Sequence, residues 1–132
     1  MTNIHPNSYV HPTAVLGDNV TVEENAYIGP LCIIGFQPEW KGHEHEDAGV
    51  IICKGARLTG MITVDTGVNS PTSIGANSYI MKHAHIGHDA LIGEGVIIAC
   101  GAKIGGHAWI GFNTNIGLNA VIHQHKSVPE NC

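Results

Sequence analysis

The sequence predicts an all-β solenoid of short stacked strands, and two observations carry this prediction. Aliphatic residues recur at every sixth position over most of the chain, and apolar residues make up 43% of it although aromatic ones make up only 5%. A period of six fits neither the 3.6-residue repeat of an α-helix nor the two-residue alternation of a half-buried strand. It fits a short strand followed by a corner, with a thin core of aliphatic side chains.

The first part of the chain keeps this repeat up to residue 34. Its aliphatic positions are Ile4, Val10, Leu16, Val22, Ile28 and Ile34. The stretch from about residue 36 to 49 is polar, contains a proline and lacks the rhythm, so we expect a loop that protrudes from the solenoid. Loops on a rigid repeat scaffold commonly carry specificity.

The repeat resumes at residue 52 and pauses once more. Ile52, Leu58 and Val64 keep the spacing, but ten residues separate Val64 from Ile74, which predicts a smaller excursion at about residues 69–73. From Ile74 to Val128 every sixth residue is aliphatic, and glycine and asparagine recur where tight turns are needed. Three units make a coil of 18 residues, and coils stack as parallel strands about 4.8 Å apart. We therefore expect one domain, residues 1–132, of about seven coils.

Composition excludes several classes of function. The chain has 6 basic and 11 acidic side chains and a net charge of −5, which argues against binding to a nucleic-acid backbone. Its four cysteines form no CxxC pair and are expected to be reduced thiols. We find no apolar run long enough to span a membrane and no signal-peptide pattern at the start, so we expect a cytoplasmic protein.

Residues 18 apart should lie above one another, and this rule gathers polar side chains on one edge of the solenoid. One column contains His88, Gly106 and Gln124, and the neighbouring one contains Asp89, His107 and His125. A histidine beside an aspartate suits a general base, because the carboxylate fixes the tautomer and stabilises the imidazolium. The columns predict an active site, whereas four other histidines are expected to be ordinary surface residues: His5, His11, His43 and His45.

The repeat resembles the hexapeptide repeat of the left-handed parallel β-helix, which implies a triangular prism with a left-handed turn. The segments Ala84–Asp89, Gly105–His107 and Ala120–Gln124 resemble the UDP-N-acetylglucosamine O-acyltransferase family of lipid A biosynthesis and its nucleotide-sugar acyltransferase relatives. The resemblance covers nearly the whole chain. It corresponds to a short form without the helical C-terminal domain that helps those enzymes hold the acyl carrier and nucleotide. Because the sequence ends at Cys132, we expect part of these contacts with the acyl carrier and the nucleotide to be absent or replaced.

The resemblance also implies roles for individual residues. His88 would be the general base that takes a proton from a sugar hydroxyl or amine as it attacks a thioester, with Asp89 as its orienting partner. The backbone N–H of Gly106 would stabilise the oxyanion, and one such donor can contribute roughly 3 kcal/mol. Residues expected to bind the substrates are His85, His107, His123, Gln124, Glu39 and Lys41.

The partners implied by the resemblance are a nucleotide-linked amino sugar and a thioester of coenzyme A or of acyl carrier protein phosphopantetheine. No metal and no bound cofactor are implied. The family works as a homotrimer with active sites in the clefts between prisms. The acyl length, the sugar and the choice between oxygen and nitrogen acylation stay open.

Two other functions compete with this hypothesis. A zinc enzyme of the γ-carbonic anhydrase type uses the same prism with three histidines gathered from two adjacent subunits, and His83, His85, His88 and His107 would supply imidazoles. The Leu-His-Gly-Cys motif of that family is absent from the chain. A non-catalytic solenoid that binds ligands on its flat faces is the other alternative.

Overall fold

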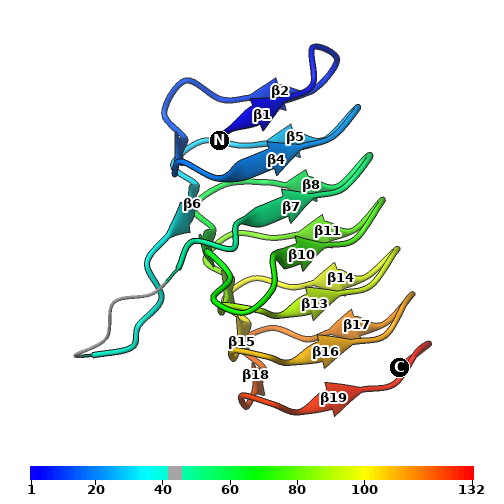
Figure 1. The fold of residues 1–132 in the computed structure, drawn as a ribbon. Helices are drawn as coiled ribbons and strands as arrows, with labels where there is room; N and C mark the ends of the chain where they lie inside the picture. Colours follow the sequence, from blue (N-terminus) through cyan, green and yellow to red (C-terminus); the bar gives the residue numbers. More distant parts are fainter. Residues whose placement is uncertain (42–45) are drawn as a thin grey trace.

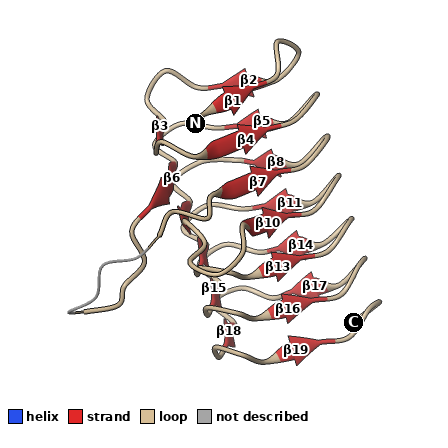
Figure 2. Ribbon diagram, viewed as in Figure 1, coloured by secondary structure: helices blue, strands red, loops and turns tan. Residues whose placement is uncertain are grey.

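The computed structural model describes residues 1–41 and 46–132, and among these residues it contains nineteen short strands and no helix. The coils follow one another from the N-terminus to the C-terminus along a single axis (Figure 1). Short turns join the strands (Figure 2), and all paired strands of the described residues run parallel. The predicted all-β solenoid, a parallel β-helix of about seven coils, is confirmed.

Each coil contributes one strand to each of three sheets. The first sheet, A, contains β1 (Asn3–Ile4), β4 (Val20–Val22), β7 (Val50–Ile52), β10 (Thr72–Ile74), β13 (Leu91–Ile92), β16 (Trp109–Ile110) and β19 (Ser127–Val128). The second sheet, B, contains β2 (Tyr9–Val10), β5 (Tyr27–Ile28), β8 (Arg57–Leu58), β11 (Tyr79–Ile80), β14 (Ile97–Ile98) and β17 (Asn115–Ile116). The third sheet, C, contains β3 (Val15–Leu16), β6 (Ile33–Phe36), β9 (Thr63–Asp65), β12 (His85–Ile86), β15 (Lys103–Ile104) and β18 (Val121–Ile122).

The register between coils follows the predicted spacing. In the C-terminal half, His85 pairs with Lys103 and Lys103 pairs with Val121, so successive coils are offset by 18 residues. The offset from Thr21 to Ile51 is 30 residues, because a long loop lies between β6 and β7. The offset from Ile51 to Ser73 is 22, because a short excursion lies between β9 and β10.

The repeating aliphatic residues form the core. Six of the predicted positions between Ile74 and Ile110 have no exposed surface, and Ile92 in the same series is only 3% exposed. A second inward position is small, so Ala84, Ala90, Ala102 and Ala108 fill the space beside the strands. Burial fades at both ends of the solenoid, where Ile4 is 46% exposed and Val128 is only partly buried.

The three corners of the prism use a left-handed backbone conformation, but with different residues. The corner from sheet A to sheet B has only asparagine and glycine at its positive φ: Asn25, Gly55, Asn77, Gly95, Asn113 and Asn131. At the corner from sheet C to sheet A, the positive φ falls on Asp89, His107 and His125. The corner from sheet B to sheet C likewise has Leu31, Met61 and His83 at positive φ, so only the first corner is restricted to asparagine and glycine.

The smaller excursion differs slightly from the expected range of residues 69–73. Strand β9 ends at Asp65 and β10 begins at Thr72, so the excursion comprises residues 66–71. Thr72 and Ser73 lie in the strand because they pair with Val50 and Ile51 of the preceding coil. The long loop runs from Phe36 to Val50, and residues 42–45 of it lie outside the described part of the chain. Within residues 1–41 and 46–132, no helix has the length and apolar character that crossing a membrane requires.

Candidate active site

The two predicted columns lie at the corner between sheets C and A. His88 and Asp89 follow β12, Gly106 and His107 follow β15, and Gln124 and His125 follow β18. The coils are joined there by backbone hydrogen bonds from the His107 N–H to the His88 carbonyl and from the His125 N–H to the Gly106 carbonyl, both 2.9 Å. The 18-residue register therefore stacks these residues as the sequence predicts.

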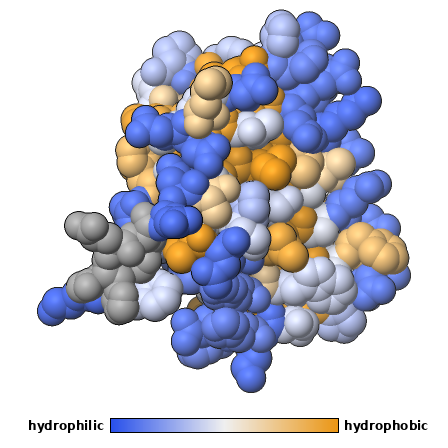
Figure 3. All heavy atoms as spheres, viewed as in Figure 1, coloured by the Kyte–Doolittle hydropathy of each residue, from blue (hydrophilic) through white to orange (hydrophobic). Residues whose placement is uncertain are grey.

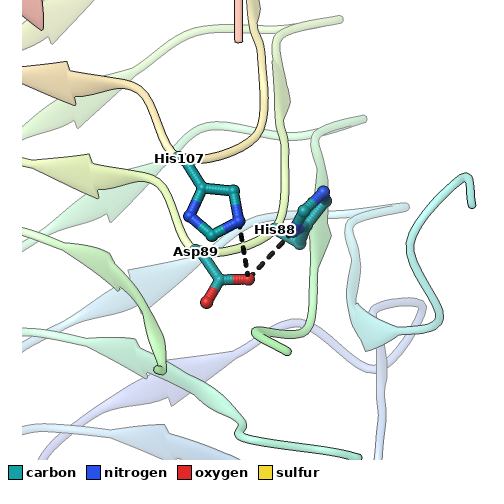
Figure 4. Close-up of side chains that lie close together, drawn as sticks. All are labelled: His88, Asp89 and His107. Atoms are coloured by element: carbon teal, nitrogen blue, oxygen red, sulfur yellow. Dashed lines mark hydrogen bonds and ion pairs between the residues drawn. The ribbon is translucent and has the colours of Figure 1, made fainter. Parts of the chain in front are cut away.

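His88 and Asp89 form a close pair. The Nδ1 atom of His88 lies 2.9 Å from Oδ2 of Asp89, whose side chain is only 1% exposed (Figure 4). Burial alone would raise the pKa of Asp89, but hydrogen bonds from the Val68 backbone, the His88 ring and the Ser70 and Asn69 backbones lower it to about 2. The carboxylate is thus ionised and only accepts. The proton between the two groups therefore belongs to Nδ1 of His88, which leaves Nε2 able to act as a base.

His107 packs against the pair from the next coil. Its ring stands edge-on to His88, with centroids 5.0 Å apart, and its Nε2 lies 3.9 Å from the same Asp89 oxygen, which is beyond hydrogen-bonding distance (Figure 4). Burial lowers the pKa of His107, and the charges of His88 and His125 lower it further, against the opposing effect of Asp89. His107 is therefore a neutral imidazole near pH 7.

A pocket of about 360 Å³ opens beside these rings. Its lining residues are Glu39, Trp40, His88, His107, Gln124 and His125. Trp40, from the long loop, stacks over His88 with 6.0 Å between centroids and 26° between planes. His125 lies parallel to His107 at 4.6 Å. The corner and the long loop together enclose the pocket.

Gly106 lies directly against the His88 ring. A Cβ atom at this position would fall 2.6 Å from Nε2 of His88, so only glycine lets the ring lie where it does. Among the hydrogen bonds of the described residues, none uses the Gly106 N–H as a donor. The Gly106 carbonyl accepts from the His125 N–H, so the N–H is the backbone group of Gly106 that has no partner among the described residues.

The remaining predicted residues divide between the two sides of this corner. A second pocket of about 260 Å³ lies on sheet C, and its lining includes His85, Gly106, His123 and Gln124. Gln124 lines both pockets. Lys41 is exposed and is not among the described residues that line either one.

His85 is more constrained than expected of a free ligand-binding side chain. Its Nδ1 lies 2.7 Å from the Thr63 hydroxyl, and its Nε2 lies 3.4 Å from a carboxylate oxygen of Asp65. Both partners come from β9, whose register with β12 is 22 residues because of the smaller excursion. The 18-residue rule therefore did not indicate them.

The histidines set aside as surface residues have local roles where they are described. The Nδ1 atoms of His5 and His11 accept hydrogen bonds from the backbone N–H groups two residues later, at 3.0 and 3.1 Å. These contacts tighten two turns near the N-terminus. His43 and His45 lie outside the described residues.

The donor set for zinc differs from the one expected. Among the described residues, His88, Asp89 and His107 form a group close enough to hold a metal ion, but His85 is not part of it. His83 lies at a different corner, between β11 and β12. Both oxygens of Asp89 already accept hydrogen bonds from backbone N–H groups. Within one chain, the four proposed imidazoles are not gathered into one site.

Two residues of the pocket, Trp40 and His125, were not among the predicted site residues. The column rule had already placed His125 above His107, which was the signal that could have added it to the site. Trp40 carries no such signal, because a loop has no register from which its position can be inferred.

The buried Asp89 carboxylate makes the stability of the protein sensitive to acid. Its pKa is lower in the folded chain, so its contribution, about 2 kcal/mol, is complete above pH 5 and is lost as the pH falls from about 4 to 2. We expect the free energy of unfolding, measured in urea at fixed protein concentration, to drop across this interval. An Asp18→Asn variant, which removes an exposed carboxylate, should show the same drop, whereas Asp89→Asn should lack it. An equal drop in the Asp89→Asn variant would contradict the assignment.

Comparisons with known proteins identify relatives of the whole solenoid. A family model described as bacterial transferase hexapeptide (six repeats) matches residues 1–36 and 71–106, more than half of the chain. The UDP-N-acetylglucosamine acyltransferase from Campylobacter jejuni is 29% identical with a TM-score of 0.69, covering 98% of this chain and 64% of that chain. The corresponding enzyme from Bacteroides fragilis is 25% identical with a TM-score of 0.71, covering 97% of this chain and 65% of that one.

A third structure shares the fold alone. The acetyltransferase domain of PglB from Neisseria gonorrhoeae, solved in complex with acetyl coenzyme A, is 17% identical with a TM-score of 0.70, covering 95% of this chain and 55% of that chain. The present chain spans less than two thirds of the length of each of these three structures.

Proposed function

Because the chain belongs to the bacterial transferase hexapeptide family, we propose that it is an acyltransferase that moves an acyl group from a thioester to a nucleotide-linked amino sugar. The observation that carries this proposal is the His88–Asp89 pair beside a pocket, with Gly106 against the imidazole. The structures from Campylobacter jejuni and Bacteroides fragilis, at 29% and 25% identity, are UDP-N-acetylglucosamine acyltransferases, which supports the same class of reaction.

In this reaction His88 acts as the general base. Its Nε2 takes the proton from the acceptor hydroxyl or amine while the oxygen or nitrogen forms a bond to the thioester carbonyl carbon. The carbonyl oxygen becomes an oxyanion and accepts a hydrogen bond from the Gly106 N–H. The intermediate then breaks its C–S bond, and the departing thiolate takes the proton from the His88 imidazolium. Asp89 stabilises that imidazolium and keeps the ring in one orientation.

The acceptor occupies the pocket that His88 lines. His107, Gln124 and Glu39 offer hydrogen-bonding groups to the sugar, and His125 joins them as a neighbour of His107. His123 and His85 line the adjacent pocket on sheet C and contact the diphosphate or the pantetheine arm of the donor. Lys41, exposed on the loop, contributes a positive charge toward the nucleotide diphosphate.

The donor is a thioester of coenzyme A or of an acyl carrier protein, and the transfer needs no bound cofactor. Four free thiols fit a reducing cytoplasmic location, where such donors are made. We propose a homotrimer whose prisms pack side by side. Large apolar side chains project outward from all three sheets, including Tyr9, Leu91 and Val121, and contact between prisms would cover part of this surface. Figure 3 shows apolar surface of this kind among hydrophilic side chains.

The test is a panel of donors and acceptors. Purified protein is mixed with acyl-coenzyme A or acyl carrier protein thioesters of increasing chain length, together with UDP- or dTDP-linked amino sugars. We expect free thiol and acylated nucleotide sugar to form in equal amounts, as measured by mass spectrometry, and only when both substrates are present. Absence of acylated sugar across the whole panel would contradict the proposal and favour a non-catalytic binding solenoid. The position of the new acyl group distinguishes an ester from an amide.

A further inference from the structure

The smaller excursion does more than connect β9 to β10, because three consecutive backbone N–H groups in it converge on one carboxylate. The N–H of Val68 donates to Oδ2 of Asp89 at 2.9 Å, and those of Asn69 and Ser70 donate to Oδ1, both at 2.8 Å. Asp89 also donates its own N–H to the Thr72 hydroxyl at 2.9 Å. The excursion therefore wraps around the aspartate that faces His88.

These contacts use up the hydrogen-bonding capacity of the carboxylate. A carboxylate offers about four lone-pair sites, and here it accepts from three backbone N–H groups of the excursion, from Nδ1 of His88 and, at 3.5 Å, from the Ser70 hydroxyl. With only 1% of the side chain exposed, no water competes for these sites. The position of Asp89 is thus set by backbone atoms of a different coil.

The excursion is itself held in place from two directions. The N–H of Gly67 donates to the Gly49 carbonyl, and the N–H of Ala48 donates to the Gly67 carbonyl, both at 2.9 Å. A Cβ atom at Gly67 would fall 1.8 Å from the Ser70 carbonyl oxygen, so this tight turn requires glycine. Gly49 ends the long loop that carries Trp40. The excursion is therefore hydrogen-bonded both to this loop and to Asp89, and both border His88.

We propose that the backbone N–H groups of Val68, Asn69 and Ser70 form a cradle that positions Asp89 and, through it, sets the tautomer and orientation of His88. This inference rests on the proposed function, since it assigns the excursion a part in general-base catalysis. The three residues are positioning residues, because they act on the acceptor only through Asp89 and His88.

The cradle acts on His88 through the charge and position of Asp89. By fixing Asp89 as an anion that only accepts hydrogen bonds, it keeps the proton on Nδ1 of His88 and leaves Nε2 free. Among the described residues, His107 also faces Asp89, and Glu39, His107 and His125 share the pocket with His88. Loss of one cradle N–H should therefore loosen the position of Asp89 and weaken the preference of His88 for a proton on Nδ1.

The kinetic test replaces one donor of the cradle. Asn69→Pro removes an N–H, whereas Asn69→Ala keeps it, and the Asn69 side chain is exposed and forms no hydrogen bond within the described residues. We expect Asn69→Pro to lower kcat with little change in KM, and the ¹⁵N spectrum of its His88 ring to lose the preference for a proton on Nδ1. We expect the His88 ring of Asn69→Ala to keep the wild-type ¹⁵N spectrum, because the N–H is retained. A loss of activity in Asn69→Pro with the wild-type ¹⁵N spectrum would overturn the proposal, because it would indicate a merely structural role.

A spectroscopic test does not depend on turnover or on a variant that folds. In the wild-type protein, ¹⁵N spectra of the His88 ring should show the proton on Nδ1. The amide protons of Asn69 and Ser70, both in exposed residues, should exchange slowly with solvent. Rapid exchange of these amides, or a proton on Nε2 of neutral His88, would overturn the cradle. If the amides are protected and the tautomer is as expected but no acylated sugar forms with any donor, the cradle stands and the proposed function fails.

Discussion

His88→Ala is expected to lower kcat for acyl transfer by about 10³-fold, because general-base catalysis contributes 10²- to 10⁴-fold and the variant lacks the proposed base. The side chain lies at a corner, is 19% exposed and lines the pocket, so its removal leaves the aliphatic core untouched. We expect the far-ultraviolet circular dichroism spectrum and the apparent mass of the assembly to stay unchanged. Added imidazole should restore part of the rate by acting as a base in the space that the ring vacates.

His5→Ala is the matched control for this variant. His5 lies in the first coil, at the opposite end of the solenoid from the final coils, and its ring only accepts a hydrogen bond from the Asn7 N–H (Figure 1). Its kcat should stay within about twofold of the wild type. A His88→Ala protein with wild-type turnover would end the assignment of the base, whatever the behaviour of the control.

Gly106→Ala should cost about 10²-fold in kcat through a single methyl group. The new Cβ would fall 2.6 Å from Nε2 and about 3 Å from two carbon atoms of the His88 ring, and real contacts of this length do not occur. The ring must therefore rotate away, and a displacement of about 1 Å in a reacting group can reduce the rate by about 10²-fold. The backbone N–H of residue 106 is retained, so the loss reports the position of His88.

Gly117→Ala isolates the effect of the added methyl group. A Cβ at Gly117 has no neighbour within 4 Å, so this variant should keep both the wild-type melting temperature and the wild-type kcat. In Gly106→Ala the melting temperature should change little, because an imidazole at the surface can move. Normal turnover in Gly106→Ala would contradict the proposed mechanism, since it would mean that Nε2 of His88 is not needed where the structure has it.

The fold could be predicted almost completely because each coil repeats the same constraint. An aliphatic residue at every sixth position has one inward-facing place in a parallel coil, and Ile80, Ile98 and Ile104 are accordingly buried without exposed surface. Ile4 departs from this pattern because the first coil has a neighbour on one side only. The exact limits of the smaller excursion were less predictable, since Thr72 is buried through pairing with another coil rather than by the six-residue rhythm.

The candidate site could be predicted only where it follows the register. The spacing of 18 residues brings His88 to Gly106 and Asp89 to His107, and it also placed His125 in the second column. The cradle of Asp89 could not be foreseen, because backbone N–H groups have no signature in the amino-acid sequence. The contacts of His85 with Thr63 and Asp65 were not predicted either, because the excursion lengthens that coil and the 18-residue spacing does not apply to it.

The stacking of coils also determines how the site can change in the course of evolution. His88 and His107 stand on adjacent turns, and their separation follows from the rise of about 4.8 Å between neighbouring strands, which backbone hydrogen bonds enforce along the entire prism. Substitutions can change the side chains on either coil, but they do not change the distance between neighbouring coils. New specificities on this scaffold must therefore arise from the identity of the corner residues and from inserted loops, while the spacing between coils stays the same.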